Sequence, residues 1–174
     1  MNSVRSAAGF TLIELMFAIT ILGIVMAVGV PSFTTMIQNN RMVTTTNDLN
    51  GTLQYARAEA VRRGGNVRVS AIGGDVSNGL RAWVDGNNDG DFDAGEELRV
   101  LRIDFGDLAL GADVGGTDTA NLDFTFNARG ASSLGNTLVL GLCDDRDGDY
   151  GRRLELLVSG AVRLTRNTAC TSEE

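Results

Sequence analysis

Near its N-terminus the 174-residue chain reads GFTLIELMFAITILGIVMAVGV, from Gly9 to Val30. Apart from Thr11, Glu14 and Thr20, every residue in this run is apolar or glycine. A helix over residues 10–30 would be about 31 Å long, which matches the hydrocarbon thickness of a bilayer. We therefore expect residues 10–30 to form a transmembrane helix.

The position of Gly9, ahead of the apolar run, bears on how the chain is processed. An ordinary secretory signal is cut after its apolar region, at a site of small residues. A cut after Gly9 would remove a short leader, residues 1–9, and leave the apolar helix on the mature protein. It would also create a new α-amino group on Phe10.

Glu14 is the only ionisable residue in the apolar run. An ionisable group inside a spanning helix is costly and is usually retained for a partner. The amine of Phe10 on one subunit could neutralise Glu14 of a neighbour when apolar helices bundle. The alternative is a plain single-pass anchor that tolerates one glutamate near the membrane edge. The residues alone leave both interpretations open.

The segment GFTLIE, residues 9–14, resembles the processing motif of type IV pilins. The resemblance implies that a prepilin peptidase cuts after Gly9 and methylates the new N-terminal Phe10. It also implies that Glu14 guides docking of the subunit into a growing filament. Such a protein is expected as a single-pass protein of the bacterial inner membrane, with its globular domain in the periplasm, before it joins a filament.

Apolar residues continue at spacings of mostly three or four after Pro31, a residue that would kink a helix by removing a hydrogen bond. Residues 31–65 should therefore form the amphipathic half of the same helix. Cations at Arg62 and Arg63, followed by two glycines, predict the end of the helix at about residue 63. The apolar positions are Phe33, Ile37, Met42, Leu49, Leu53, Ala56 and Ala60.

Residues 66–174 contain short strand-like runs separated by Gly, Asn and Asp. One N-terminal helix followed by antiparallel β-structure is an α+β domain, in which the apolar face of the helix packs on a sheet. Residues 111–120 are predicted to be the loosest loop. The expected strands cover residues 67–72, 80–84, 98–103, 122–126, 137–142, 154–158 and 162–164.

Three further segments resemble the GspH/FimT branch of the pilin family: LQYARAEAVRR at 53–63, FTFNARG at 124–130 and CDDR at 143–146. The resemblance implies the type IV pilin fold and a minor pilin, FimU-like or FimT-like, at or near a filament tip where it helps to start assembly. The alternative is an H-type pseudopilin of type II secretion, which supports protein export. Expected partners are other minor and major pilins or pseudopilins, the prepilin peptidase and the inner-membrane assembly platform.

Composition argues against catalysis. The chain has no histidine, the commonest general base and transition-metal ligand. No phosphate-loop pattern is present either. We therefore expect a protein that is not an enzyme.

The net charge of −7 argues against a general nucleic-acid binder, whose surface is usually basic.

Cys143 and Cys170 are the only two cysteines. Such a pair fits one structural disulfide formed in an oxidising compartment. In the chain-entropy description, closing this loop would contribute about 3–4 kcal/mol. The alternative is two unrelated buried thiols.

A loop with the pattern of a calcium site runs from Asp85 to Glu96 and fits D-x-[DN]-x-[DN]-G-x5-E. Its flanks are strand-like and not helical, so a solvated hairpin loop is the alternative. Calcium is the only cofactor that the sequence suggests. The oxygen ligands would come from Asp85, Asn87, Asp89, the Asp91 carbonyl, Asp93 and Glu96, with Gly90 permitting the sharp turn.

Arginines gather in the expected C-terminal hairpin, at Arg152, Arg153, Arg163 and Arg166. A small arginine patch can bind phosphates even on an acidic protein. If residues 159–161 form a three-residue loop, Arg153 and Arg163 lie on one face of the hairpin. The opposite, apolar face would then hold Leu154, Leu156, Val158, Val162 and Leu164.

FimT-like members of the family can bind DNA during natural transformation through a C-terminal Gly-Arg-x-Arg pattern. Here residues 160–163 read GAVR, so the first arginine of that pattern is missing. A DNA-binding minor pilin is the competing function of a different class. The other interpretations of the arginine hairpin are a solvated face and a contact to a neighbouring pilin.

Overall fold

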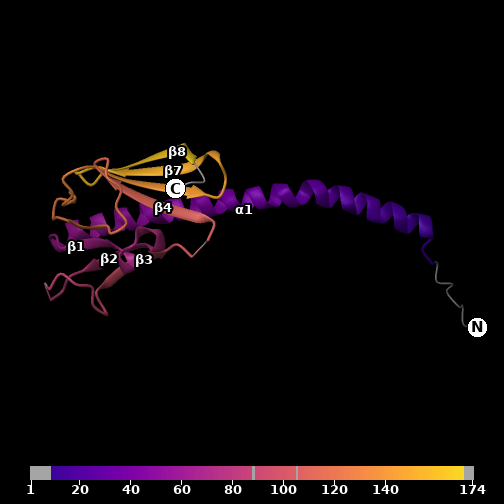
Figure 1. Ribbon diagram of the computed structural model, residues 1–174. Helices are drawn as coiled ribbons and strands as arrows, with labels where there is room; N and C mark the ends of the chain where they lie inside the picture. Colours follow the sequence, from indigo (N-terminus) through magenta and orange to yellow (C-terminus); the bar gives the residue numbers. More distant parts are fainter. Residues whose placement is uncertain (1–8, 88, 105, 171–174) are drawn as a thin grey trace, which may run out of the picture. The chain divides into compact units, whose positions relative to one another are not determined.

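The computed structural model describes residues 9–87, 89–104 and 106–170. The chain divides into two units, residues 1–39 and residues 40–174. One helix, α1 (Leu12–Arg63), runs through both, and Pro31 lies inside it without ending it (Figure 1). Within the described residues, α1 is the one helix long and apolar enough to cross a membrane. The predicted helix, with its end at about residue 63, is confirmed.

The second unit contains two four-stranded antiparallel sheets, where the sequence predicted one. The first sheet has the strand order β3-β2-β1-β5, and the second has the order β4-β6-β7-β8. Two short 3-10 helices, η1 (Ile72–Gly74) and η2 (Val76–Asn78), lie between β1 and β2. The strands are β1 (Val67–Ala71), β2 (Gly79–Val84), β3 (Glu97–Arg102), β4 (Leu108–Val114), β5 (Asp123–Phe126), β6 (Leu138–Asp144), β7 (Gly148–Leu156) and β8 (Val162–Cys170).

One hydrophobic core joins α1 to both sheets. The part of α1 within the second unit runs alongside both sheets in Figure 1. Its apolar face is buried at the predicted positions from Met42 to Ala60, and it meets buried residues of both sheets. Phe33 and Ile37 belong to the first unit and are exposed, Phe33 by 68%. The periodic apolar series is therefore a core face only from residue 42 onward.

Strand β4 corrects the first part of the loop predicted over residues 111–120, because residues 111–114 belong to the strand. Leu108, Leu110 and Ala112 are buried, while the residues between them, Ala109 and Gly111, are exposed. Every residue of β4 pairs with a residue of β6. The alternation was hidden in the sequence because the outward side chains are small and resemble those of a loop.

The predicted disulfide between Cys143 and Cys170 is present. Cys143 lies on β6 and Cys170 ends β8, so the bridge fixes the last strand to the second sheet. Gly151 lies on β7, the strand between them, where an added Cβ would lie 2.7 Å from the Cys170 Sγ. A glycine at this position leaves room for the bridge.

Glu59 makes the stability of the domain depend on pH. It is buried near the end of α1 and accepts hydrogen bonds from the guanidinium groups of Arg62 and Arg63. These bonds lower the pKa of the Glu59 carboxyl from 4.5 to about 2. A carboxyl whose pKa is depressed by folding adds stability above its unfolded pKa, and this stability is lost as the pH falls through the folded pKa.

We therefore expect the thermal unfolding midpoint to fall between about pH 4.5 and pH 2, and Glu59→Gln to reduce this fall. Unfolding followed by circular dichroism at several pH values would measure both. If Glu59→Gln and the unmodified chain lost stability in parallel over this window, Glu59 would not be the group responsible.

Candidate functional site

The predicted processing and docking residues lie at the start of α1. Gly9 and Phe10 precede the helix, and the Phe10 side chain is 85% exposed. The Thr11 hydroxyl accepts a hydrogen bond from the Glu14 backbone N–H at 3.3 Å, as a helix N-cap does. Glu14 therefore lies in the first turn of α1, separated from the predicted cut by residues 10–13. Residues 1–8 of the predicted leader lie outside the described residues.

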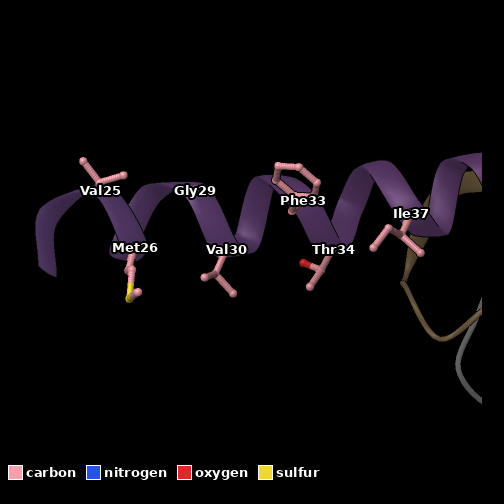
Figure 2. A pocket seen from close by; sticks show the side chains of 7 residues that line it. All are labelled: Val25, Met26, Gly29, Val30, Phe33, Thr34 and Ile37. Atoms are coloured by element: carbon pink, nitrogen blue, oxygen red, sulfur yellow. The ribbon is translucent and has the colours of Figure 1, made fainter. Parts of the chain in front are cut away.

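The apolar side chains of α1 remain uncovered from Leu12 to Ile37. Figure 2 shows the stretch around Gly29, where Val25, Gly29 and Phe33 follow one another along one side of the helix. Because Gly29 has no side chain, the backbone between Val25 and Phe33 is bare. An apolar surface of this length is stable in a bilayer or against other apolar helices.

The four arginines of the C-terminal hairpin lie on two faces and do not form one patch. Arg153 and Arg163 share the outer face, as predicted. Arg152 and Arg166 are paired across β7 and β8 on the other face. A DNA duplex bound to one face of the hairpin would therefore contact only two of the four arginines. DNA binding stays a prediction, which binding of a short duplex at low salt would test.

The loop of this hairpin covers residues 158–160, one residue earlier than predicted. The Leu157 N–H donates to the Ala161 carbonyl at 2.9 Å, and the Gly160 N–H donates to the Leu157 carbonyl at 2.8 Å. Val158 is therefore a loop residue and is 43% exposed, which corrects the prediction that it belongs to the buried face. Leu156 is buried, as predicted, and it pairs with Val162.

The loop over residues 85–96 packs on the first sheet through an aromatic side chain. The ring of Phe92 meets the buried Trp83 edge to face, with 5.8 Å between the centroids. The Arg81 guanidinium lies 3.7 Å from the centroid of the Phe92 ring. Sequence patterns did not reveal this anchor. The alternation of Arg81 and Trp83 along β2 is its only local signal.

The acidic side chains of this loop do not converge as a calcium site requires. In the described part of the chain, no group of three or more His, Cys, Asp or Glu side chains could hold a metal ion. Asp89 and Asp93 accept hydrogen bonds from the Asn87 amide, at 2.7 and 3.0 Å. Glu96 accepts from two backbone N–H groups, those of Gly86 and Asp93. The residues as arranged here do not fit a calcium cage.

Calcium binding therefore stays a prediction of the sequence pattern alone. Calorimetric titration of the purified chain with calcium would test it. Saturable heat at or below about 1 mM calcium would support a site of the affinity that extracellular modules show. No binding heat at millimolar calcium would leave a solvated hairpin loop.

Two of the family-like segments meet at the end of α1. The Arg57 Nε donates to the Gly130 carbonyl at 3.0 Å. Gly160, in the loop of the C-terminal hairpin, approaches this same carbonyl so closely that an added Cβ would lie 1.8 Å from its oxygen. Residues 53–63 and 124–130 therefore hold the hairpin on the helix. Their role in the structure is packing, and sequence reasoning missed the part played by Gly160.

The third family-like segment, residues 143–146, leads from β6 into the turn before β7. The Asp144 carboxylate is buried and accepts a hydrogen bond from the Arg146 Nε at 3.0 Å. The Arg146 guanidinium also lies 4.1 Å from the centroid of the Tyr150 ring on β7. These contacts hold the turn together from within the chain, so the segment has a structural role.

The apolar helix that follows a processing motif, joined to a domain of two antiparallel sheets, defines a type IV pilin-like protein. A sequence model of the family described as "Type II transport protein GspH" matches residues 45–161, and one of the "Prokaryotic N-terminal methylation motif" matches residues 4–30. The first match covers more than half of the chain. The chain therefore belongs to the GspH family.

Two type IV pilins are similar to this chain, one in sequence and one in structure. The type IV major fimbrial protein FimA of Dichelobacter nodosus is 29% identical over 126 residues, which cover 72% of this chain and 75% of FimA. The crystal structure of the type IV minor pilin FimU of Pseudomonas aeruginosa in space group P21 matches with a TM-score of 0.61 and 25% identity. This match covers 76% of this chain and 95% of FimU. A second crystal form of FimU, in P65, matches with a TM-score of 0.52 and 25% identity over 74% of this chain and 97% of FimU.

Proposed function

We propose that the chain is a minor pilin of a type IV pilus, incorporated at or near the filament tip, where it helps to start assembly. The observation that carries this proposal is the uncovered apolar part of α1, with Glu14, the last residue of the processing motif, in its first turn. Similarity to FimU over most of the length of that protein supports the minor-pilin role. The proposed role is structural and involves no catalysis.

In this role, α1 first anchors the chain in the bacterial inner membrane, with the domain in the periplasm. Cleavage after Gly9 by a prepilin peptidase then frees the Phe10 amine. The amine of a neighbouring pilin and the Glu14 carboxylate neutralise each other when apolar helices pack together. The bilayer and the helix bundle are both apolar, so moving α1 from one to the other gains little from the hydrophobic effect. The charge pair and the close packing of the helices therefore favour the docked state.

An H-type pseudopilin of type II secretion is the second candidate. The family match over residues 45–161 favours this candidate, because the description of that family names a type II transport protein. Both roles use the same anchor, helix and domain. The two candidates differ only in whether the chain is assembled into a type IV pilus or into a type II secretion pseudopilus.

Deletion of the gene in its own host would separate the two candidates. A minor pilin is expected to be needed for surface pili and not for export of type II substrates. The first readout is the amount of pilin sheared from the cell surface, and the second is the amount of secreted enzyme in the medium. Normal pili with a loss of secretion would overturn the pilus role in favour of the pseudopilus.

A further inference from the structure

Two arginines face each other in a groove between α1 and the C-terminal hairpin. Arg152 on β7 is the direct cross-strand partner of Arg166 on β8. Val43, on the α1 side of the groove, is 45% exposed although it belongs to the helix half that packs on the domain. The groove is lined by Val43, Thr46, Asn47, Arg152, Leu164 and Arg166.

This pair of like charges is unfavourable within the domain. Like charges directly opposite each other on antiparallel strands destabilise a sheet. The Arg152 guanidinium donates to the Asn167 side chain at 3.1 Å, but no carboxylate among the described residues forms an ion pair with Arg152 or Arg166. The neighbouring pair on the outer face is complementary, because Arg163 lies opposite Glu155. An anionic partner would remove the repulsion.

Carboxylates without an ion pair are found on the loop over residues 85–96. Asp89, Asp91 and Asp93 are exposed, and in the described part of the chain none of them forms an ion pair. The hydrogen bonds of Asp89 and Asp93 come from neutral groups of the same loop. Arg68 interacts electrostatically with Asp91, but its ion pairs are formed with other carboxylates.

The loop and the groove lie at opposite ends of the domain. Strand β2 ends at Val84, which pairs with Val67, close after the end of α1. The groove instead contains Val43, Thr46 and Asn47, near the beginning of the second unit. A loop at one end and a groove at the other can join copies head to tail. Such a contact is heterologous, because the two copies use different surfaces.

We propose that the groove of Arg152 and Arg166 binds the acidic loop, residues 89–93, of a second copy of this chain. The guanidinium groups pair with the exposed carboxylates of Asp89, Asp91 and Asp93. The contact joins soluble domains, so it goes beyond the helix packing of the proposed function and can be tested separately from it.

The absence of lysine makes a direct test possible, because the 15 basic side chains are all arginines. Arg166→Lys keeps the charge and introduces a single side-chain amine in the groove. Full-length chains labelled with ¹⁴N and ¹⁵N are mixed in detergent micelles and treated with a carbodiimide, which joins amines to nearby carboxylates. Mass spectrometry is expected to find mixed-isotope cross-links from position 166 to residues 89–93. Arg163→Lys, on the outer face, is the matched control and should give few.

Charge reversal at Arg152 provides the second measurement. In the Arg166→Lys chain, Arg152→Glu should lower the yield of these cross-links about fivefold, because it replaces attraction with repulsion. Arg153→Glu changes the net charge equally on the outer face and should leave the yield unchanged. Thermal unfolding checks that each variant is folded. Equal yields from positions 163 and 166, cross-links to other carboxylates, or binding of a short DNA duplex without inter-copy cross-links would overturn the proposal.

Discussion

A chain with Glu14→Ala is expected to reach the membrane and fold, but to be almost absent from filaments. In the proposed docked state, the Glu14 carboxylate neutralises an amine of a neighbouring subunit in an apolar helix bundle. Removing one partner of a buried charge pair costs about 3–5 kcal/mol, which corresponds to a loss of about a hundredfold or more in the docked population. Immunoblots of sheared filaments and of membranes from the same cells would measure the distribution.

Glu14→Asp keeps a carboxylate and is the control for the charge. It should restore part of the incorporation, whereas Glu14→Gln should resemble alanine because it cannot neutralise an amine. Incorporation of Glu14→Ala at the level of the unmodified chain would show that Glu14 has no role in docking.

Gly160→Ala is expected to lower the free energy of unfolding of the domain by about 3 kcal/mol or more. Gly160 has a φ of 79°, a left-handed conformation that a side chain strains, and the new Cβ would overlap the Gly130 carbonyl oxygen. The hairpin would have to move away from the end of α1. Urea unfolding followed by Trp83 fluorescence would measure the loss.

Gly74→Ala separates the two causes of this loss. Gly74 has the same φ of 79°, but an added Cβ there would meet nothing within 4 Å. Its substitution should cost about 1–2 kcal/mol, the strain of the left-handed conformation alone. An equal loss at Gly74 and Gly160 would contradict the close packing of the hairpin on Gly130.

The sequence was sufficient for the features with strong local signals. The end of α1 was predictable because Arg62, Arg63 and two glycines follow a periodic apolar face, and the disulfide because only two cysteines exist. Strand β4 was missed because Ala109 and Gly111 carry little side chain on its outer face. Strand β8 extends to Cys170, beyond the predicted end at residue 164, because pairing with β7 and not apolar alternation maintains it.

Local sequence patterns could not predict the features that depend on tertiary contacts. The spacing of the acidic residues matches a calcium loop, but spacing alone could not show that these side chains accept hydrogen bonds from an amide and from backbone N–H groups of the same loop. The arginines are close in sequence, but the register of β7 and β8 assigns them to two faces. The contact between Arg57, Gly130 and Gly160 joins three distant segments and has no signal in any one of them.

The intact mass of the chain, purified from cells that contain a prepilin peptidase, is the most direct measurement of whether α1 is retained for assembly. We expect a mature chain that begins at Phe10 and carries one added methyl group, with the whole apolar helix present. A chain cut after the apolar run, or one that keeps residues 1–9 in the presence of the peptidase, would contradict the pilin mechanism.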